Sequence, residues 1–130
     1  MRIIVGAFLW LVICLTAGCG DEYDQGTDLA QLAAMEQEII DLIGTPTCDD
    51  DSVCVAIAFG AKACGGPMKY LIYSNSSVDR SLLESKVNKY NEFNRVLNQR
   101  HGWMSDCSVP VRPELECREG VCSRTGRIQE

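Results

Sequence analysis

CDDDSVCVAIAFGAKACGGPMKYLIY, residues 48–73, carries the strongest structural signals in the chain. Residues 53–59 are apolar throughout and rich in β-branched side chains, which is typical of a central strand. Residues 68–73 predict a second strand, and the Gly-rich residues 60–67 connect the two. We therefore expect an antiparallel hairpin with a long loop.

Amphipathic helices are predicted on both sides of this hairpin, because apolar residues recur there every three or four positions. The first helix is expected over residues 28–43, with Thr27 or Asp28 as its cap and Gly44 as its stop. The second is expected over residues 79–100. Their apolar stripes, which should pack on the domain itself, are Leu29, Leu32, Met35, Ile39, Leu42 and Ile43 in the first helix and Leu83, Val87, Tyr90, Phe93 and Leu97 in the second.

The fold class follows from the order of these elements. Residues 115–123 predict a short hairpin with Gly120 in its turn, while Pro110 and Pro113 keep the preceding residues outside the sheet or at its edge. The chain of 130 residues is long enough for one domain. We expect an α+β fold, namely a small disulfide-stapled domain in which an antiparallel sheet packs with two amphipathic helices.

The first residues have the features of an export signal. Met1-Arg2 is basic, residues 3–15 carry no charge, and small residues lead to Cys19. Small residues directly before a cysteine resemble the bacterial lipobox, although Thr16 stands where Leu is usual. This resemblance implies cleavage before Cys19, a diacylglyceryl thioether on its sulfur and an acylated amine. The apolar run is too short for a membrane-spanning helix, which needs about 20 apolar residues.

The sequence therefore divides into residues 1–18 as a lipoprotein signal peptide, residues 19–26 as a lipid-anchored tether and residues 27–130 as a single cysteine-rich domain. Lipidation would anchor the protein to a membrane of the bacterial cell envelope. Gly20, not Asp, follows the cysteine, which by the sorting rule of enteric bacteria favours the outer membrane, facing the periplasm or the surface. The alternative is ordinary signal cleavage near Gly20 and a freely secreted protein.

The cysteine count agrees with export. Of the 8 cysteines, Cys14 would leave with the signal and Cys19 would take the lipid. An even set remains, which in an exported domain predicts three disulfides whose pairing the sequence leaves open. A metal site is not expected, because the chain has no C-x₂-C pair and a single histidine. The cysteines expected in disulfides are Cys48, Cys54, Cys64, Cys107, Cys117 and Cys122.

Charge is distributed unevenly along the chain. Residues 20–51 hold ten acidic residues and no Lys or Arg, whereas residues 52–130 hold eleven basic and eight acidic residues. The acidic part is either a solvated arm and helix or a segment that folds back on the mildly basic body. Because the sequence has no basic run, nucleic acid is not expected as a partner.

No catalytic centre is predicted. Nucleophilic triads need a histidine, and the one candidate, His101, stands at a helix end where the dipole favours it anyway. Residues 49–51 (DDD) lack the alternating ligands and central Gly of a calcium loop. The loop 60–67 leads into a strand rather than a helix, so it does not match a phosphate-binding loop. We expect neither a cofactor nor enzymatic activity.

A set of motifs runs through residues 48–124. They are C-x₅-C at Cys48, F-G-x-K-x-C-G-G-P at Phe59, Tyr70, Tyr73-Ser74, Tyr90-Asn91, Ser105-Asp106-Cys107, Pro113 and C-x₂-G-x-C at Cys117. This set resembles a family of small cysteine-rich bacterial lipoproteins. The resemblance implies a shared disulfide-stapled α+β domain, and it implies no activity.

Two classes of function stay open. In the first, the domain is a non-catalytic, inhibitor-like binding module for an unidentified envelope or extracellular protein, because a loop pinned by a disulfide presents its backbone at low entropic cost. That surface would comprise Lys62 as the exposed tip, Gly65, Gly66, and Tyr70 and Tyr73 as flanking contacts. In the second, the protein is a structural lipoprotein that acts in envelope assembly through its helices.

Asparagine recurs on the second predicted helix, at Asn88, Asn91, Asn94 and Asn98. Asparagine has low helix propensity, so tertiary packing must hold this helix. The row is either a polar recognition stripe or a solvated face that forms hydrogen bonds with nearby loops.

Overall fold

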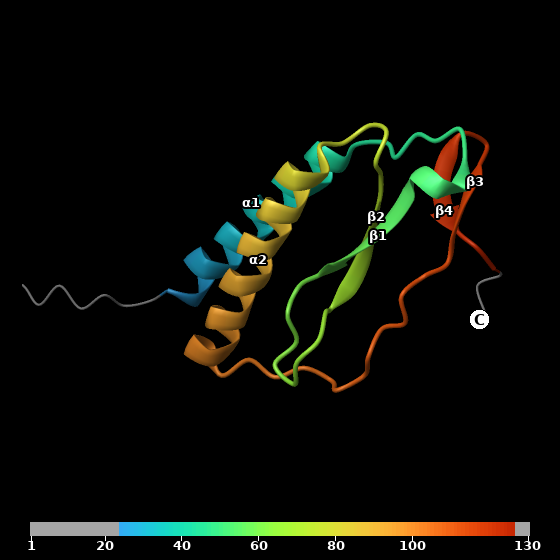
Figure 1. Cartoon of the computed structure of the whole chain (residues 1–130). Coiled ribbons are helices and arrows are strands. Elements are labelled where there is room, and N and C mark those ends of the chain that lie inside the picture. Colours follow the sequence, from blue (N-terminus) through green and yellow to red (C-terminus); the bar gives the residue numbers. More distant parts are fainter. Residues whose placement is uncertain (1–23, 127–130) are drawn as a thin grey trace, which may run out of the picture.

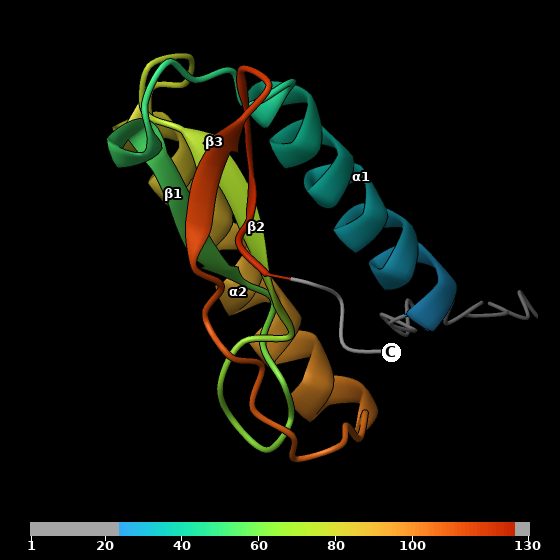
Figure 2. The same ribbon diagram turned by 90° about the vertical axis from the view of Figure 1, so that its right-hand side faces the viewer.

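The computed structural model describes residues 24–126, which form two helices and two antiparallel hairpins (Figure 1). The two helices lie side by side and cover one face of the central hairpin, and the C-terminal hairpin lies against its other face (Figure 2). The expected α+β class is confirmed. In chain order the elements are α1 (Gln25–Ile43), the 3₁₀ turn η1 (Asp51–Val53), β1 (Cys54–Phe59), β2 (Lys69–Ser74), α2 (Arg80–His101), β3 (Leu115–Arg118) and β4 (Val121–Arg124).

The central hairpin has the predicted antiparallel register, from Cys54 opposite Ser74 to Phe59 opposite Lys69. Because side chains alternate along a strand, one face of the hairpin turns its apolar residues toward the helices. The Phe59 ring stacks on that of Tyr90 in α2, with the ring centroids 4.1 Å apart. The buried core consists of Leu32, Ile39, Ile43, Phe59, Tyr73, Val78, Leu83, Val87, Tyr90 and Leu97.

Helix α1 begins earlier than predicted, because Asp24 is its N-cap in place of Thr27 or Asp28. The Asp24 carboxylate accepts hydrogen bonds from the backbone N–H groups of Gly26 and Thr27. Helix α2 is capped by Asp79 and ends at Gly102, which has the left-handed conformation of a C-terminal stop. Within residues 24–126, no helix combines the length and the apolar run needed to cross a bilayer.

The six expected cysteines form three disulfides, as predicted. Cys54–Cys122 joins β4 to the start of β1, and Cys48–Cys117 joins β3 to the segment just before η1. Cys64–Cys107 joins the β1–β2 loop to the segment that follows α2. Since disulfides persist in oxidising compartments, these bridges indicate an exported protein.

The expected single sheet is instead two separate two-stranded sheets, β1–β2 and β3–β4. Residues 103–114 contain no strand, which agrees with the position predicted for Pro110 and Pro113. The chain therefore reaches β3 as an irregular segment. Disulfides, together with an isolated β-bridge between Thr47 and Val121, join the C-terminal hairpin to the rest of the domain. The predicted signal peptide, Cys19 and the first part of the tether lie outside the described residues.

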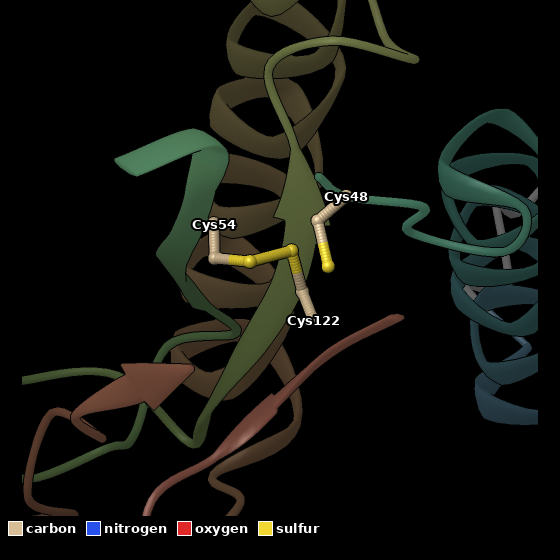
Figure 3. Close-up of side chains that lie close together, drawn as sticks. All are labelled: Cys48, Cys54 and Cys122. Atoms are coloured by element: carbon tan, nitrogen blue, oxygen red, sulfur yellow. A yellow bond between two sulfur atoms is a disulfide. The ribbon is translucent and has the colours of Figure 1, made fainter. Parts of the chain in front are cut away.

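Two of the disulfides lie next to each other. The Sγ atoms of Cys48, Cys54 and Cys122 all lie within 4.8 Å of one another. Figure 3 shows the three side chains close together. Such a cluster has the spacing of a metal site, but all three sulfurs are already bonded in disulfides, and the thiolate is the form that ligates metal. The two neighbouring disulfides therefore form a pair of adjacent covalent links.

We predict that full reduction collapses the near-UV circular dichroism of the protein at 25 °C. The bridges close loops of 43 to 69 residues. In the chain-entropy treatment each bridge of that span contributes about 4 kcal/mol, against a total stability of about 5–15 kcal/mol for a domain. Partial reduction followed by alkylation should label the exposed Cys64 and Cys107 first, because access limits thiol attack. An unchanged spectrum after complete reduction would show that the bridges do not hold the fold.

Candidate functional site

An open groove with a volume of about 410 Å³ lies between α1, the end of α2 and the β1–β2 loop. Ligand sites in proteins are typically clefts of about 300–1,000 Å³ with mostly apolar walls, and this groove fits that description. Its apolar lining comes from three segments, namely Leu29, Leu32 and Ala33 of α1, Ala61, Ala63 and Met68 of the loop region, and Trp103 and Met104 after α2. We take this groove as the candidate site.

The wall of the groove formed by the loop is held by asparagines of α2. Asn91 Oδ1 accepts a hydrogen bond from the Gly60 backbone N–H at 2.7 Å, and Asn94 Oδ1 accepts one from that of Ala61 at 2.8 Å. Asn98 Nδ2 donates to the Ala61 carbonyl at 2.7 Å. The asparagine row is therefore, over three of its four members, a set of hydrogen bonds to a nearby loop rather than a free recognition stripe.

Gly60 is the point at which this loop leaves β1. Its φ is +78°, a value that L side chains rarely adopt, and a Cβ there would come within 2.8 Å of the Met68 side chain. Because glycine has no side chain, Gly60 allows both the sharp turn out of the strand and the close approach of Met68. That approach sets Met68 at the mouth of the groove.

Lys62 is not the exposed tip that the sequence suggested. Its side chain is 11% exposed, and Nζ lies 2.5 Å from Asp106 Oδ1 and 2.5 Å from the Ser108 carbonyl oxygen. This hydrogen bond from Lys62 holds the pKa of Asp106 below its usual value, with a further contribution from the Ser108 hydroxyl. Lys62 therefore fastens the loop to the segment after α2, alongside the Cys64–Cys107 bridge.

The other residues proposed for the loop surface divide into exposed and internal positions. Gly65 and Gly66 are exposed at the tip, with φ values of +94° and +82°. Tyr73 is 1% exposed and belongs to the core, so the suggestion that it flanks a contact surface was wrong. Tyr70 is partly buried and pairs with Ala58 on the face of the hairpin that turns away from the helices. Neither tyrosine lines the groove.

Polar groups around the groove are paired within the protein. Glu36 forms an ion pair with Lys69 at 2.7 Å. Burial, aided by the neighbouring Glu36 carboxylate, raises the pKa of the Tyr90 hydroxyl to about 12, so this phenol stays protonated at neutral pH. Because the groups beside the groove already have partners, apolar contact and shape are what the groove offers to a ligand.

His101 forms part of a buried anchor between the two helices. Its Nε2 lies 2.7 Å from Oδ2 of Asp28, and Nη1 of Arg100 donates to the same oxygen at 3.0 Å. These hydrogen bonds, first that with His101 and then that from Arg100, hold the pKa of Asp28 below its ordinary value. The His101 ring also stacks on Trp103, with centroids 5.1 Å apart, so this anchor supports one wall of the groove.

The acidic helix thus folds back on the body, which was one of the two arrangements that the charge distribution left open. Besides the Asp28 contacts and the Glu36–Lys69 pair, Glu38 lies 2.5 Å from Lys86 of α2. Sequence reasoning missed the groove residues Leu29, Met68, Trp103 and Met104. A signal for two of them was present, since Trp103-Met104 is an apolar pair directly after a helix stop.

Comparisons with known proteins add nothing to this geometry. No protein-family model matches the chain, and no curated protein or solved structure matches it either. The resemblance to small cysteine-rich lipoproteins therefore stays an expectation from the motifs.

Asn94→Ala should lower the free energy of unfolding by about 1–3 kcal/mol, because it leaves the Ala61 N–H without its buried acceptor. Asn88→Ala is the matched control, since Asn88 is exposed on the same helix and gains the same helix propensity. Its effect should stay within about 0.5 kcal/mol. Urea denaturation of both variants measures the difference. Equal stabilities would mean that the asparagine contacts do not hold the loop.

Asp28→Asn should destabilise the protein at neutral pH, and the difference from the parent should shrink in acid. The folded-state pKa of Asp28 lies below the ordinary value of 3.8, so the ionised carboxylate stabilises the fold above that pH. This stabilisation is lost as the pH falls through the folded-state pKa. Urea denaturation across a pH series tests this, with the exposed-turn variant Asp49→Asn as the charge-matched control. A deficit that stays constant down to low pH would contradict the role given to the Asp28 charge.

Proposed function

We propose that this protein is a lipoprotein of the bacterial cell envelope, anchored through Cys19, whose domain is a non-catalytic binding module. The groove is the observation that supports a binding module. A rigid loop forms one of its walls, and apolar side chains form most of its lining. Three kinds of contact hold that loop in place: the Cys64–Cys107 disulfide, the Lys62 contacts and the asparagine hydrogen bonds. A surface fixed in this way loses little conformational entropy when it binds.

The alternative, an assembly protein that docks through its helices, has less support. The predicted apolar stripes of both helices supply most of the buried core. Three acidic residues of α1, Glu36, Glu38 and the buried Asp28, form ion pairs with basic residues of the same domain. Outside the groove, the exposed large apolar side chains of the described helices are Ile40 and Leu82.

A catalytic role has less support from the residues that the structure describes. His101, the single histidine, is bound to Asp28 and is 10% exposed in its side chain. The six cysteines of the domain are in disulfides and so offer no thiolate nucleophile. The groove is bordered by an ion-paired glutamate and a protonated tyrosine, a combination that supports binding better than acid–base chemistry.

The intact mass of the protein extracted from membranes, without reduction, tests the anchor. We expect a chain that begins at Cys19, carries the mass of the diacylglyceryl and acyl groups, and lacks six hydrogens relative to the fully reduced form. Cys19→Ser should keep the three disulfides and lose the lipid. A native chain that begins after Cys19 and carries no lipid would contradict the anchor and support the freely secreted alternative.

A further inference from the structure

Four apolar side chains line the groove at the end of the domain where α1 begins. They are Leu29, Met68, Trp103 and Met104, here called the tether-end patch. Met104 is 94% exposed, Met68 53% and Leu29 48%. Trp103, the fourth member, is partly buried and packs against the core. Single exposed apolar residues are common on soluble proteins, whereas here three exposed side chains from three separate segments line one groove.

The patch lies close to the point where the proposed anchor joins the domain. Asp24, the cap of α1, is five residues after Cys19, so the stretch between them spans at most about 17 Å. Leu29 is five residues further along the helix, a rise of about 7.5 Å. The contact of Asp28 with Arg100 and His101 places the end of α2, and with it Trp103, beside the same turn of α1. Figure 1 shows these two helix ends together, with the β1–β2 loop and the segment after α2 at the same end of the molecule.

We propose that the tether-end patch rests in the interfacial layer of the bilayer that holds the Cys19 lipid. This inference rests on the anchor proposed above. It identifies the bilayer as the binding partner of the groove region. A tether this short keeps one end of the domain at the membrane, and three of the eight exposed large apolar side chains of the described residues, Leu29, Met68 and Met104, lie at that end. Tryptophan favours the membrane–water interface, and the flexible methionine side chains adapt to an irregular surface.

The charges at this end of the domain favour apolar contact over electrostatic attraction. Lys62 is paired with Asp106, Lys69 with Glu36, and Asp28 with both Arg100 and His101. Paired charges give little net attraction to anionic lipids, so the contact should not depend strongly on ionic strength. The acyl chains would hold the protein at the membrane, and the patch would fix which face of the domain turns toward it.

The protein offers its own probe for this contact. The sequence has two tryptophans, Trp10 and Trp103, and cleavage before Cys19 removes the first. The full-length mature lipoprotein is reconstituted into phosphatidylcholine vesicles whose acyl chains are brominated near the headgroup, and into unbrominated vesicles. Bromine quenches tryptophan on contact, so we expect weaker Trp103 emission in the brominated vesicles, with no change when salt is raised.

Leu29→Asp combined with Met104→Asp should remove this quenching while the protein still floats with the vesicles. Leu82→Asp is the matched control, because Leu82 is 46% exposed on a helix and lies at the far end of α2. It should be quenched like the parent protein. Near-UV circular dichroism before reconstitution verifies that both variants are folded.

The outcomes separate the anchor from the patch. Flotation with equal emission in both kinds of vesicle would leave the anchor standing and overturn the membrane contact. Failure to float would overturn the anchor and the inference together. Emission that shifts with protein concentration in detergent, without quenching in vesicles, would assign the patch to a second copy of the chain and likewise overturn the membrane contact.

Discussion

Covalent links between the two halves of the chain are the constraint on which this structure depends. Neither hairpin extends the other as a hydrogen-bonded sheet, and the backbone pairing of the C-terminal hairpin with the preceding chain is limited to an isolated bridge between Thr47 and Val121. Cys48–Cys117 and Cys54–Cys122 add covalent connections at adjacent positions. A domain of this size has a small core, and small exported domains commonly use disulfides to limit the freedom of the unfolded chain.

A second set of constraints positions the groove, and it is polar. The loop after β1 contains no helix or strand, so its backbone N–H and C=O groups need other partners if they are to leave water. Asn91, Asn94 and Asn98 provide those partners from α2, and Lys62 fastens the other side of the loop. These hydrogen bonds to the loop offset the low helix propensity of asparagine. A better helix former such as alanine could not make them.

Much of the fold could be predicted from local pattern. The period of the apolar residues located both helices, and the run of β-branched residues located β1, because these signals depend on neighbours in sequence. The cap of α1 was misplaced since several residues before Leu29 are chemically able to cap, and only the chain path selects Asp24. The disulfide pairing and the role of Lys62 depend on contacts across more than 40 residues, which no local pattern contains.

The same limit explains why the candidate site was only partly anticipated. The Gly-rich loop was recognised, but its lysine was assigned outward because an isolated charged residue is usually solvated. The partner that turns it inward, Asp106, lies 44 residues away in the irregular segment before the last hairpin. Once the lysine is internal, the loop presents a short Gly tip and an apolar wall instead of a positive charge.

An apolar wall beside the start of α1 also gives the molecule two distinct ends, because β1 runs from the acidic turn at residues 49–51 to this loop. A short tether at the apolar end would therefore turn the acidic turn away from the membrane. These two ends of the domain are separated by the length of β1.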